Sequence, residues 1–240
     1  MAAEEYELVF RVLAMGCRSQ RDGQAEFEHL KSPVARRSGR IARLDLRNNL
    51  VLLRRWFAQP LRDELWSDWL ERYSALLRHH VGASDAWAAD VSACVSDALD
   101  YAGDDPPAEV RRPLTDPAVE SLLGFDAIEQ SLDAWRSRLG VGRVVLAGYT
   151  KTLYPVWRAC DRLGIDVVAV ADDGPAFVGQ SYRGVPVLGL DASEGLGIDG
   201  WVVADRNPAR APGLQRLLAA RGRPVWALAE PGADAPAADR

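Results

Sequence analysis

Four short apolar runs in the second half of the chain form its clearest hydrophobic pattern. The runs cover residues 144–147, 167–170, 200–204 and 224–229. Continuous apolar runs of this kind are typical of strands buried on both faces of a parallel sheet. Apolar residues at helical spacing lie between them, over 153–163 and 208–220, and a further short strand is expected at 185–188. The pattern predicts an α/β fold built on a small parallel sheet.

One strand–helix–strand unit, residues 143–173, organises this half of the chain. Gly148 ends its first strand and permits a sharp turn, Thr150 is expected to cap the helix that follows, and Gly164 ends that helix. Asp172 and Asp173 close the second strand. The loop after the first strand is the place where an open α/β sheet usually binds its ligand.

The first half of the chain is predicted to be mostly helical from the spacing of its apolar residues. Amphipathic helices are expected over 4–16, 41–58, 60–80 and 84–99, with a helical pair over 116–139 and a short strand over 25–30. The segment between these helices and the sheet is rich in proline and charge. The predicted organisation is a helical segment over 1–103, a linker over 104–117, an α/β domain over 118–230 and a disordered tail over 231–240.

Composition narrows the classes of function. The net charge of −5 does not favour a nucleic-acid-binding protein. The three cysteines, Cys17, Cys94 and Cys160, form neither a metal pattern nor a disulfide framework, which favours a reducing compartment. No apolar run approaches the roughly 18 residues of a membrane span, and the first residues are acidic where a secretory signal is basic. A cytoplasmic protein is expected.

The first candidate for a ligand-binding site is the turn after residue 147. Backbone N–H groups and the positive end of a helix favour a phosphate there, and the acids that end the next strand are placed to accept hydrogen bonds from a ribose. The alternatives are a plain turn without ligand and a solvated strand end. The candidate residues for a nucleotide or cofactor are Gly148, Tyr149, Thr150, Lys151, Asp172 and Asp173.

Charged residues near the N-terminus are candidates of a second kind. A basic stretch over 31–55, which includes Arg36 and Arg37, is suited to a phosphate or an anionic membrane surface, or is simply a solvated face. Glu4 and Glu5 precede an apolar helix, where they favour the helix dipole or supply a general base. His29 has no second ligand at metal spacing, so no metal site is predicted.

Residues 4–80 resemble the C-terminal end of family-2 glycosyltransferases with the GT-A fold. The resemblance lies in EEYELVFRVLAMGCRS, FEHLKSPVARRSGR and LDLRNNLVLLRRWF. It implies that Glu4 and Glu5 are the catalytic acidic pair, with Glu5 as the base, although Glu stands where Asp is usual. It further implies that His29 lies near the sugar diphosphate. Arg36 and Arg37 of the basic stretch are the other candidates for substrate binding.

This resemblance covers about the last third of such an enzyme. The family's nucleotide-binding half and its D-x-D metal motif would come before Glu4, so a truncated transferase is expected. Without the metal carboxylates nothing neutralises the leaving diphosphate. Glycosyl transfer, and a divalent metal, are therefore expected only when the missing half is supplied, for example as a separate glycosyltransferase subunit.

Residues 141–229 are similar to the Rossmann-like domains that begin polysaccharide-biosynthesis dehydratases and sugar acyltransferases. The segment from Val170 to Gly189, VADDGPAFVGQSYRGVPVLG, carries the resemblance, whereas AGYTKT at 147–152 replaces the usual G-A-G-x-x-G. The resemblance implies binding of a nucleotide or nucleotide sugar.

The resulting hypothesis is a glycosyltransferase-related protein of polysaccharide or glycoconjugate biosynthesis, cytoplasmic or peripheral to the inner face of the membrane. One alternative is an NAD-dependent nucleotide-sugar oxidoreductase or epimerase, although no catalytic Tyr-x-x-x-Lys signature is present. The other is a non-catalytic assembly module, which exposed apolar surface near Tyr6, Val9 and Phe10 would favour.

Overall fold

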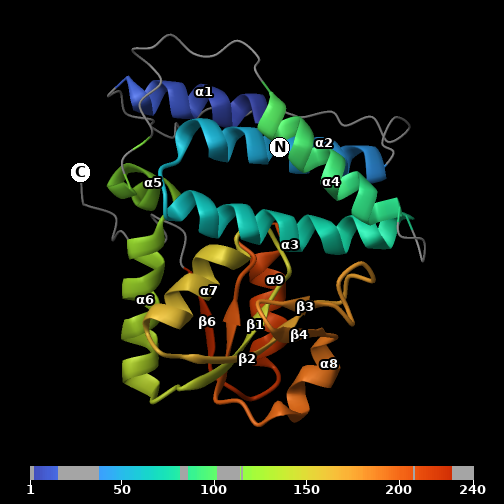
Figure 1. Ribbon diagram of the computed structural model, residues 1–240. Coiled ribbons are helices and arrows are strands. Elements are labelled where there is room, and N and C mark those ends of the chain that lie inside the picture. The colour runs from blue at the N-terminus through green and yellow to red at the C-terminus, as the bar shows by residue number, and fades with distance from the viewer. Residues whose placement is uncertain are drawn as a thin grey trace. The chain divides into compact units, whose positions relative to one another are not determined.

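The computed structural model describes residues 3–15, 38–81, 86–101, 114, 116–207 and 209–228, with only the backbone for a few of them. The chain divides into two compact units, Met1–Leu122 and Leu123–Arg240. The elements of both are labelled in Figure 1. The general α/β class predicted from the apolar runs is confirmed.

Unit 1 is helical in its described residues. Its helices are α1 (Ala3–Ala14), α2 (Ser38–Trp56), α3 (Leu61–Val81), α4 (Ala86–Asp100) and α5 (Asp116–Leu123), whose last residue falls in unit 2. Helix α2 packs against both α3 and α4. Fully buried Leu46, Leu50 and Trp56 of α2 and Leu77 of α3 form its core. The helices predicted at 41–58, 60–80 and 84–99 are therefore present, with ends shifted by a few residues.

Helix α1 is held to α2 by aromatic contacts. The ring of Phe10 lies 6.4 Å from that of Trp56 and 5.4 Å from that of Phe57, and Phe10 is buried. The exposed large apolar side chains in this part of the chain are those of Leu8, in the helix, and Met15, just after it. The exposure that would favour an assembly module is thus absent at Phe10 and only partial at Val9, while the side chain of Tyr6 lies outside the described residues.

A short backbone contact follows the segment predicted as a linker. The N–H of Leu114 donates to the carbonyl of Trp56 at 2.7 Å, next to a parallel bridge between Leu114 and Phe57. Leu114 is buried, and α5 begins at Asp116. The C-terminal part of the predicted linker is therefore packed on unit 1, and the remainder of it lies outside the described residues.

Unit 2 contains a six-stranded sheet of order β3-β4-β2-β1-β5-β6, parallel except for β3. Its strands are β1 (Arg143–Ala147), β2 (Asp166–Ala171), β3 (Ser181–Tyr182), β4 (Val185–Leu188), β5 (Gly200–Val203) and β6 (Val225–Ala227). Its helices are α6 (Phe125–Leu139), α7 (Leu153–Arg162), α8 (Leu190–Ser193), the 3₁₀ turn η2 (Glu194–Leu196) and α9 (Ala211–Ala219).

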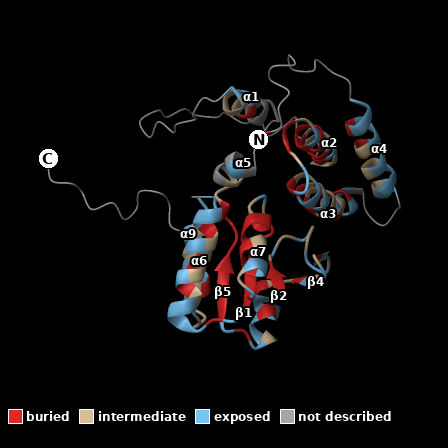
Figure 2. Cartoon of the chain, turned by 60° about the vertical axis from the view of Figure 1, so that its left-hand side comes forward, coloured by how far each residue is buried: buried red, intermediate tan, exposed pale blue. Residues whose placement is uncertain are grey.

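The strands separate two cores. Val144, Leu146 and Val202 face a cluster that includes side chains of α6 and α7, whereas Val145 and Val203 face a cluster with α8 and α9. This alternation follows from the two-residue period of a strand. Figure 2 shows β5 buried along its length, β1 buried after its exposed first residue Arg143, and the outer face of α6 exposed. The continuous apolar runs of the sequence arise because both faces of these strands are covered.

Gly200 permits close packing at the start of β5. A Cβ built on Gly200 would lie 2.9 Å from the ring of Trp135 and 2.9 Å from the carbonyl oxygen of Pro224. Only a residue without a side chain lets the indole of α6 lie directly against this strand.

The structure corrects one detail of the strand–helix–strand unit. Helix α7 begins at Leu153 and its N-cap position is Thr152, without a side-chain cap, whereas Thr150 was predicted as the cap. The turn between Gly148 and the helix is therefore two residues longer than predicted. The predicted strand at 25–30 and the tail at 231–240 lie outside the described residues. Among the described helices none is both long and apolar enough to cross a membrane.

Candidate functional site

The candidate site lies where the order of the parallel strands reverses direction. From β1 the chain proceeds to β2 and β4 on one side, and afterwards to β5 and β6 on the other. The loops after β1 and β5 therefore leave neighbouring strands at the same edge. In open α/β sheets, ligands bind at such a reversal, outside the carboxyl ends of the strands.

Gly148 allows these two loops to approach closely. It has a φ of 102°, which side chains disfavour, and a Cβ there would lie 3.1 Å from the Cβ of Asp205. The turn beyond it is also tied to β5, because the hydroxyl of Thr152 donates to the carbonyl of Ala204. The hydroxyl of Thr150 lies 3.3 Å from the same carbonyl oxygen.

Asp172 closes the turn from the other side. Its Oδ2 accepts the N–H of Tyr149 at 2.6 Å, and its Oδ1 accepts the N–H of Gly174 at 2.7 Å. Asp172, the predicted ribose acceptor, thus lies beside the turn at Gly148, and each of its oxygens already accepts one backbone hydrogen bond.

Asp173 has a comparable local role. Its Oδ1 accepts the N–H of Leu190, the first residue of α8, at 3.0 Å. This bond satisfies one of the N–H groups that a helix leaves unpaired at its start. The second predicted acid therefore joins the end of β2 to the segment that follows β4.

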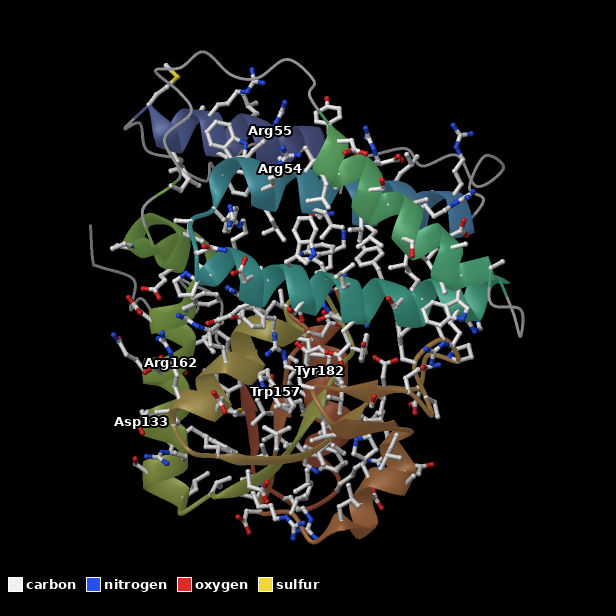
Figure 3. The ribbon with its side chains drawn as sticks, in the orientation of Figure 1. Arg54, Arg55, Asp133, Trp157, Arg162 and Tyr182 are labelled. Atoms are coloured by element: carbon white, nitrogen blue, oxygen red, sulfur yellow. The ribbon has the colours of Figure 1, made fainter. Side chains whose placement is uncertain are left out.

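The side chain of Tyr149 extends into an aromatic group beside the turn. Its ring stacks on Phe177 at 4.3 Å and meets the edge of Tyr182 at 5.7 Å. Tyr182 in turn contacts Trp157 of α7 at 5.4 Å, and these two side chains are labelled in Figure 3. Tyr149 is buried in the core cluster that includes side chains of α7, so its ring anchors the turn to the core.

The backbone of the turn makes several hydrogen bonds within the protein. The N–H of Gly148 donates to Ala171, that of Thr150 donates to Gly148, and that of Leu153 donates to Thr150. Pro155 supplies no N–H in the first turn of α7. Fewer N–H groups are left for a phosphate than a glycine-rich turn would offer. A bound anion would consequently depend more on side chains.

The loop after β5 contributes residues that the sequence analysis did not select. Asp205 is 5% exposed; its Oδ1 accepts the N–H of Asn207 at 2.9 Å, and Nη2 of Arg210 lies 2.8 Å from its Oδ2. The sequence feature that could have identified these residues is the polar segment DRNPAR, directly after the apolar run at 200–204. The buried carboxylate therefore fixes the conformation of the loop, and the Cβ and backbone N of Asp205 lie beside Gly148.

The described arginines of the basic stretch have partners inside unit 1. Arg54 donates to the carbonyl oxygens of Ala98, at 3.0 Å, and of Leu99 at the end of α4. The guanidinium groups of Arg47 and Arg55 each lie 5.0 Å from the centre of the Tyr101 ring. Arg54 and Arg55 are labelled on α2 in Figure 3. These contacts hold the end of α4 to α2.

The other predicted residues are not brought together by the described part of the chain. Glu4 and Glu5 lie in α1, but their side chains are outside the described residues, as are His29, Arg36 and Arg37 altogether. Their roles remain predictions. No group of three or more potential ligands among His, Cys, Asp and Glu is placed to hold a metal ion in the described residues.

Neither described cysteine has the environment of a nucleophile. Burial, with a smaller contribution from Asp161, raises the pKa of the Cys160 thiol to about 12. Burial also raises the pKa of Cys94. Both thiols are therefore held in the protonated, unreactive form at neutral pH.

Comparison with known proteins gives no relative to assist this assignment. No family model, no curated protein and no solved structure matches the chain.

Proposed function

We propose that unit 2 is a Rossmann-like module that binds a nucleotide or nucleotide sugar at the carboxyl ends of β1 and β5. The observation that carries this proposal is the reversal of strand order at β1, together with the close approach of the two loops, where a Cβ on Gly148 would lie 3.1 Å from the Cβ of Asp205. The resemblance of the segment from Val170 to Gly189 to nucleotide-sugar-binding domains agrees with it.

In this proposal the predicted residues divide into two roles. Thr150 and Lys151 supply a hydroxyl and a positive charge to the phosphate, next to the start of α7. Asp172 and Asp173 fix the surrounding loops through Tyr149, Gly174 and Leu190. A ribose hydroxyl would then use a remaining lone pair of Asp172, because a carboxylate oxygen accepts more than one hydrogen bond.

Unit 1 belongs to the same proposal through its resemblance to family-2 glycosyltransferases. The chain would serve polysaccharide or glycoconjugate biosynthesis, with Glu5 as the base and Glu4, His29, Arg36 and Arg37 beside the substrate. Transfer would require the family's nucleotide- and metal-binding half, either in the same polypeptide or as a separate subunit. The module in unit 2 would bind or position substrate and would not itself be a catalyst.

The proposal is tested by calorimetric titration of the full chain with UDP, GDP, CDP, ADP, NAD and UDP-sugars. We expect saturable binding of one nucleotide class, weakened several-fold by Lys151→Ala. Arg138→Ala removes the same charge at the far end of α6 and should leave binding unchanged. Absence of binding by every compound would contradict the proposed function.

Two alternatives correspond to other outcomes of this titration. Tight binding of NAD alone, with reduction of the bound cofactor by a nucleotide sugar, would favour the oxidoreductase alternative. A non-catalytic assembly module is favoured by the internal hydrogen bonds of the turn and of Asp172, and failure of all ligands to bind would support it.

A further inference from the structure

We infer that Arg206, in the loop after β5, is a further residue that contacts the phosphate group of the ligand, in addition to Thr150 and Lys151. This inference rests on the proposed function, because it assigns a residue to the same site. Arg206 was not among the candidates from the sequence. It follows buried Asp205 directly and its side chain is exposed.

The position of Arg206 is defined by its neighbour Gly124. The Nη1 atom of Arg206 lies 3.5 Å from the place where a Cβ on Gly124 would be. Gly124 immediately precedes α6, and α6 leads by a short connection into β1. The start of α6 is therefore at the carboxyl end of β1, and the guanidinium, which lies beside Gly124, is at the edge where the strand order reverses.

Two helices begin at this place. The ring of Phe125, the first residue of α6, meets the ring of Tyr154, in the first turn of α7, at 6.0 Å. Neither helix has a side-chain hydrogen bond at its N-cap. Both helix dipoles therefore direct their positive ends to the region beside Arg206, which raises the preference for an anion.

Arg206 differs from two other arginines of unit 2 in having no acidic partner among the described residues. Within the described residues it makes no ion pair, whereas Arg210 pairs with Asp205 and Arg221 pairs with Asp191 and Glu194. An exposed arginine whose charge is not neutralised locally is available to a ligand.

The backbone that carries Arg206 is fixed on both sides. Asp205 accepts the N–H of Asn207, and the carbonyl of Asn207 accepts the N–H groups of Arg210 and Ala211 at 2.9 and 2.8 Å. A fixed backbone reduces the conformational entropy lost when the guanidinium binds. Guanidinium groups bind phosphate with two parallel hydrogen bonds, so a phosphate is the chemistry that this arrangement fits.

The test uses the full chain and inorganic pyrophosphate, which carries the charge without base or sugar. At low salt we expect calorimetric binding that Arg206→Ala weakens about tenfold or more, as loss of a charge-assisted hydrogen bond predicts. Arg206→Lys should retain part of the affinity. Arg216→Ala removes an equally exposed charge from α9 and should have no effect. Equal binding by Arg206→Ala and the unsubstituted chain, or no binding by either, would overturn the inference.

A second titration separates this inference from the proposed function. UDP and uridine are compared on the same variants, and circular dichroism confirms that each is folded. Weakening of UDP binding but not of uridine binding by Arg206→Ala supports both conclusions. UDP binding that Arg206→Ala leaves unchanged supports the proposed function alone. Pyrophosphate binding that depends on Arg206, without binding of any nucleotide, supports the inference alone.

Discussion

The carboxylate of Asp172 accepts the backbone N–H of Tyr149 at 2.6 Å. This bond joins the end of β2 to the turn after β1, across a helix and 23 positions of sequence. The same carboxylate binds Gly174, so one side chain sets the conformation of two loops at the edge of the sheet. An acid at this position therefore has a structural role whether or not a ribose is bound.

Asp172→Asn should destabilise unit 2. The amide can accept at only one atom, so either the Tyr149 or the Gly174 N–H loses its partner. We expect a loss of about 1–3 kcal/mol in the free energy of unfolding, the usual cost of an unpaired, partly buried donor. Urea denaturation followed by tryptophan fluorescence measures it. Asp161→Asn, at an exposed position on α7, is the matched control, and an equal effect of both substitutions would refute the structural role.

Gly200→Ala should destabilise unit 2 through overpacking. The added methyl would lie 2.9 Å from Trp135 and from the carbonyl of Pro224, so strand or indole must move. Comparable changes in filled cores cost about 1–3 kcal/mol. Thermal unfolding of the variant reports this cost. Gly213→Ala in α9, where nothing lies within 4 Å of the new Cβ, should instead stabilise by a few tenths of a kcal/mol or more.

Asp199 should make unit 2 sensitive to acid. Hydrogen bonds from the backbone N–H of Gly142, and then of Arg143, lower the pKa of this carboxyl group. A lowered folded-state pKa contributes stability above the unfolded value, about 4, and that contribution is lost as the pH falls through the folded value. The difference in urea midpoint between the unsubstituted chain and Asp199→Asn should be constant near neutral pH and shrink in acid. A difference independent of pH would contradict this explanation.

Arg54→Ala should loosen the end of α4. Removal of the guanidinium leaves the carbonyls of Ala98 and Leu99 without this donor, and the expected cost to unit 1 is about 1 kcal/mol. Hydrogen exchange should accelerate at the amides of the last turn of α4. Arg40→Ala, on the exposed side of α2, provides a comparison of equal charge. Unchanged exchange after Arg54→Ala would show that the contact does not hold the helix.

Periodicity predicted most of the described elements. The apolar runs at 144–147 and 200–204 correctly predicted β1 and β5, because strands that are covered on both faces are apolar throughout. The helices around Leu46 and Leu77 followed from their apolar faces. The two-residue strand β3 was not predicted, since Ser181 and Tyr182 are too few to produce a period.

The candidate site was only partly predictable, for a topological reason. Gly148 and Asp172 are close in sequence and belong to one strand–helix–strand unit, so their proximity could be anticipated. Asp205 and Arg206 join them only because β5 pairs with β1 on the side away from β2. Strand order is set by long-range packing, and a single sequence contains no local signal of it. The backbone hydrogen bonds that Asp172 accepts were likewise not predictable, because they depend on the conformation of the loop at Gly174.

The alternation of neighbouring residues between two cores has a consequence for insertions and deletions. Trp201 and Val202 are adjacent in β5, yet one indole fills the core beside α8 and α9 while the next side chain enters the core that holds Trp135 and Trp226. Loss of a single residue within this strand would exchange the two sets of side chains. One core would then receive a third indole and the other a void. Insertions and deletions are consequently tolerated at the ends of this strand and not within it. The register of β5 in the sheet is therefore fixed by the need to place the indole of Trp201 in the core that has room for it.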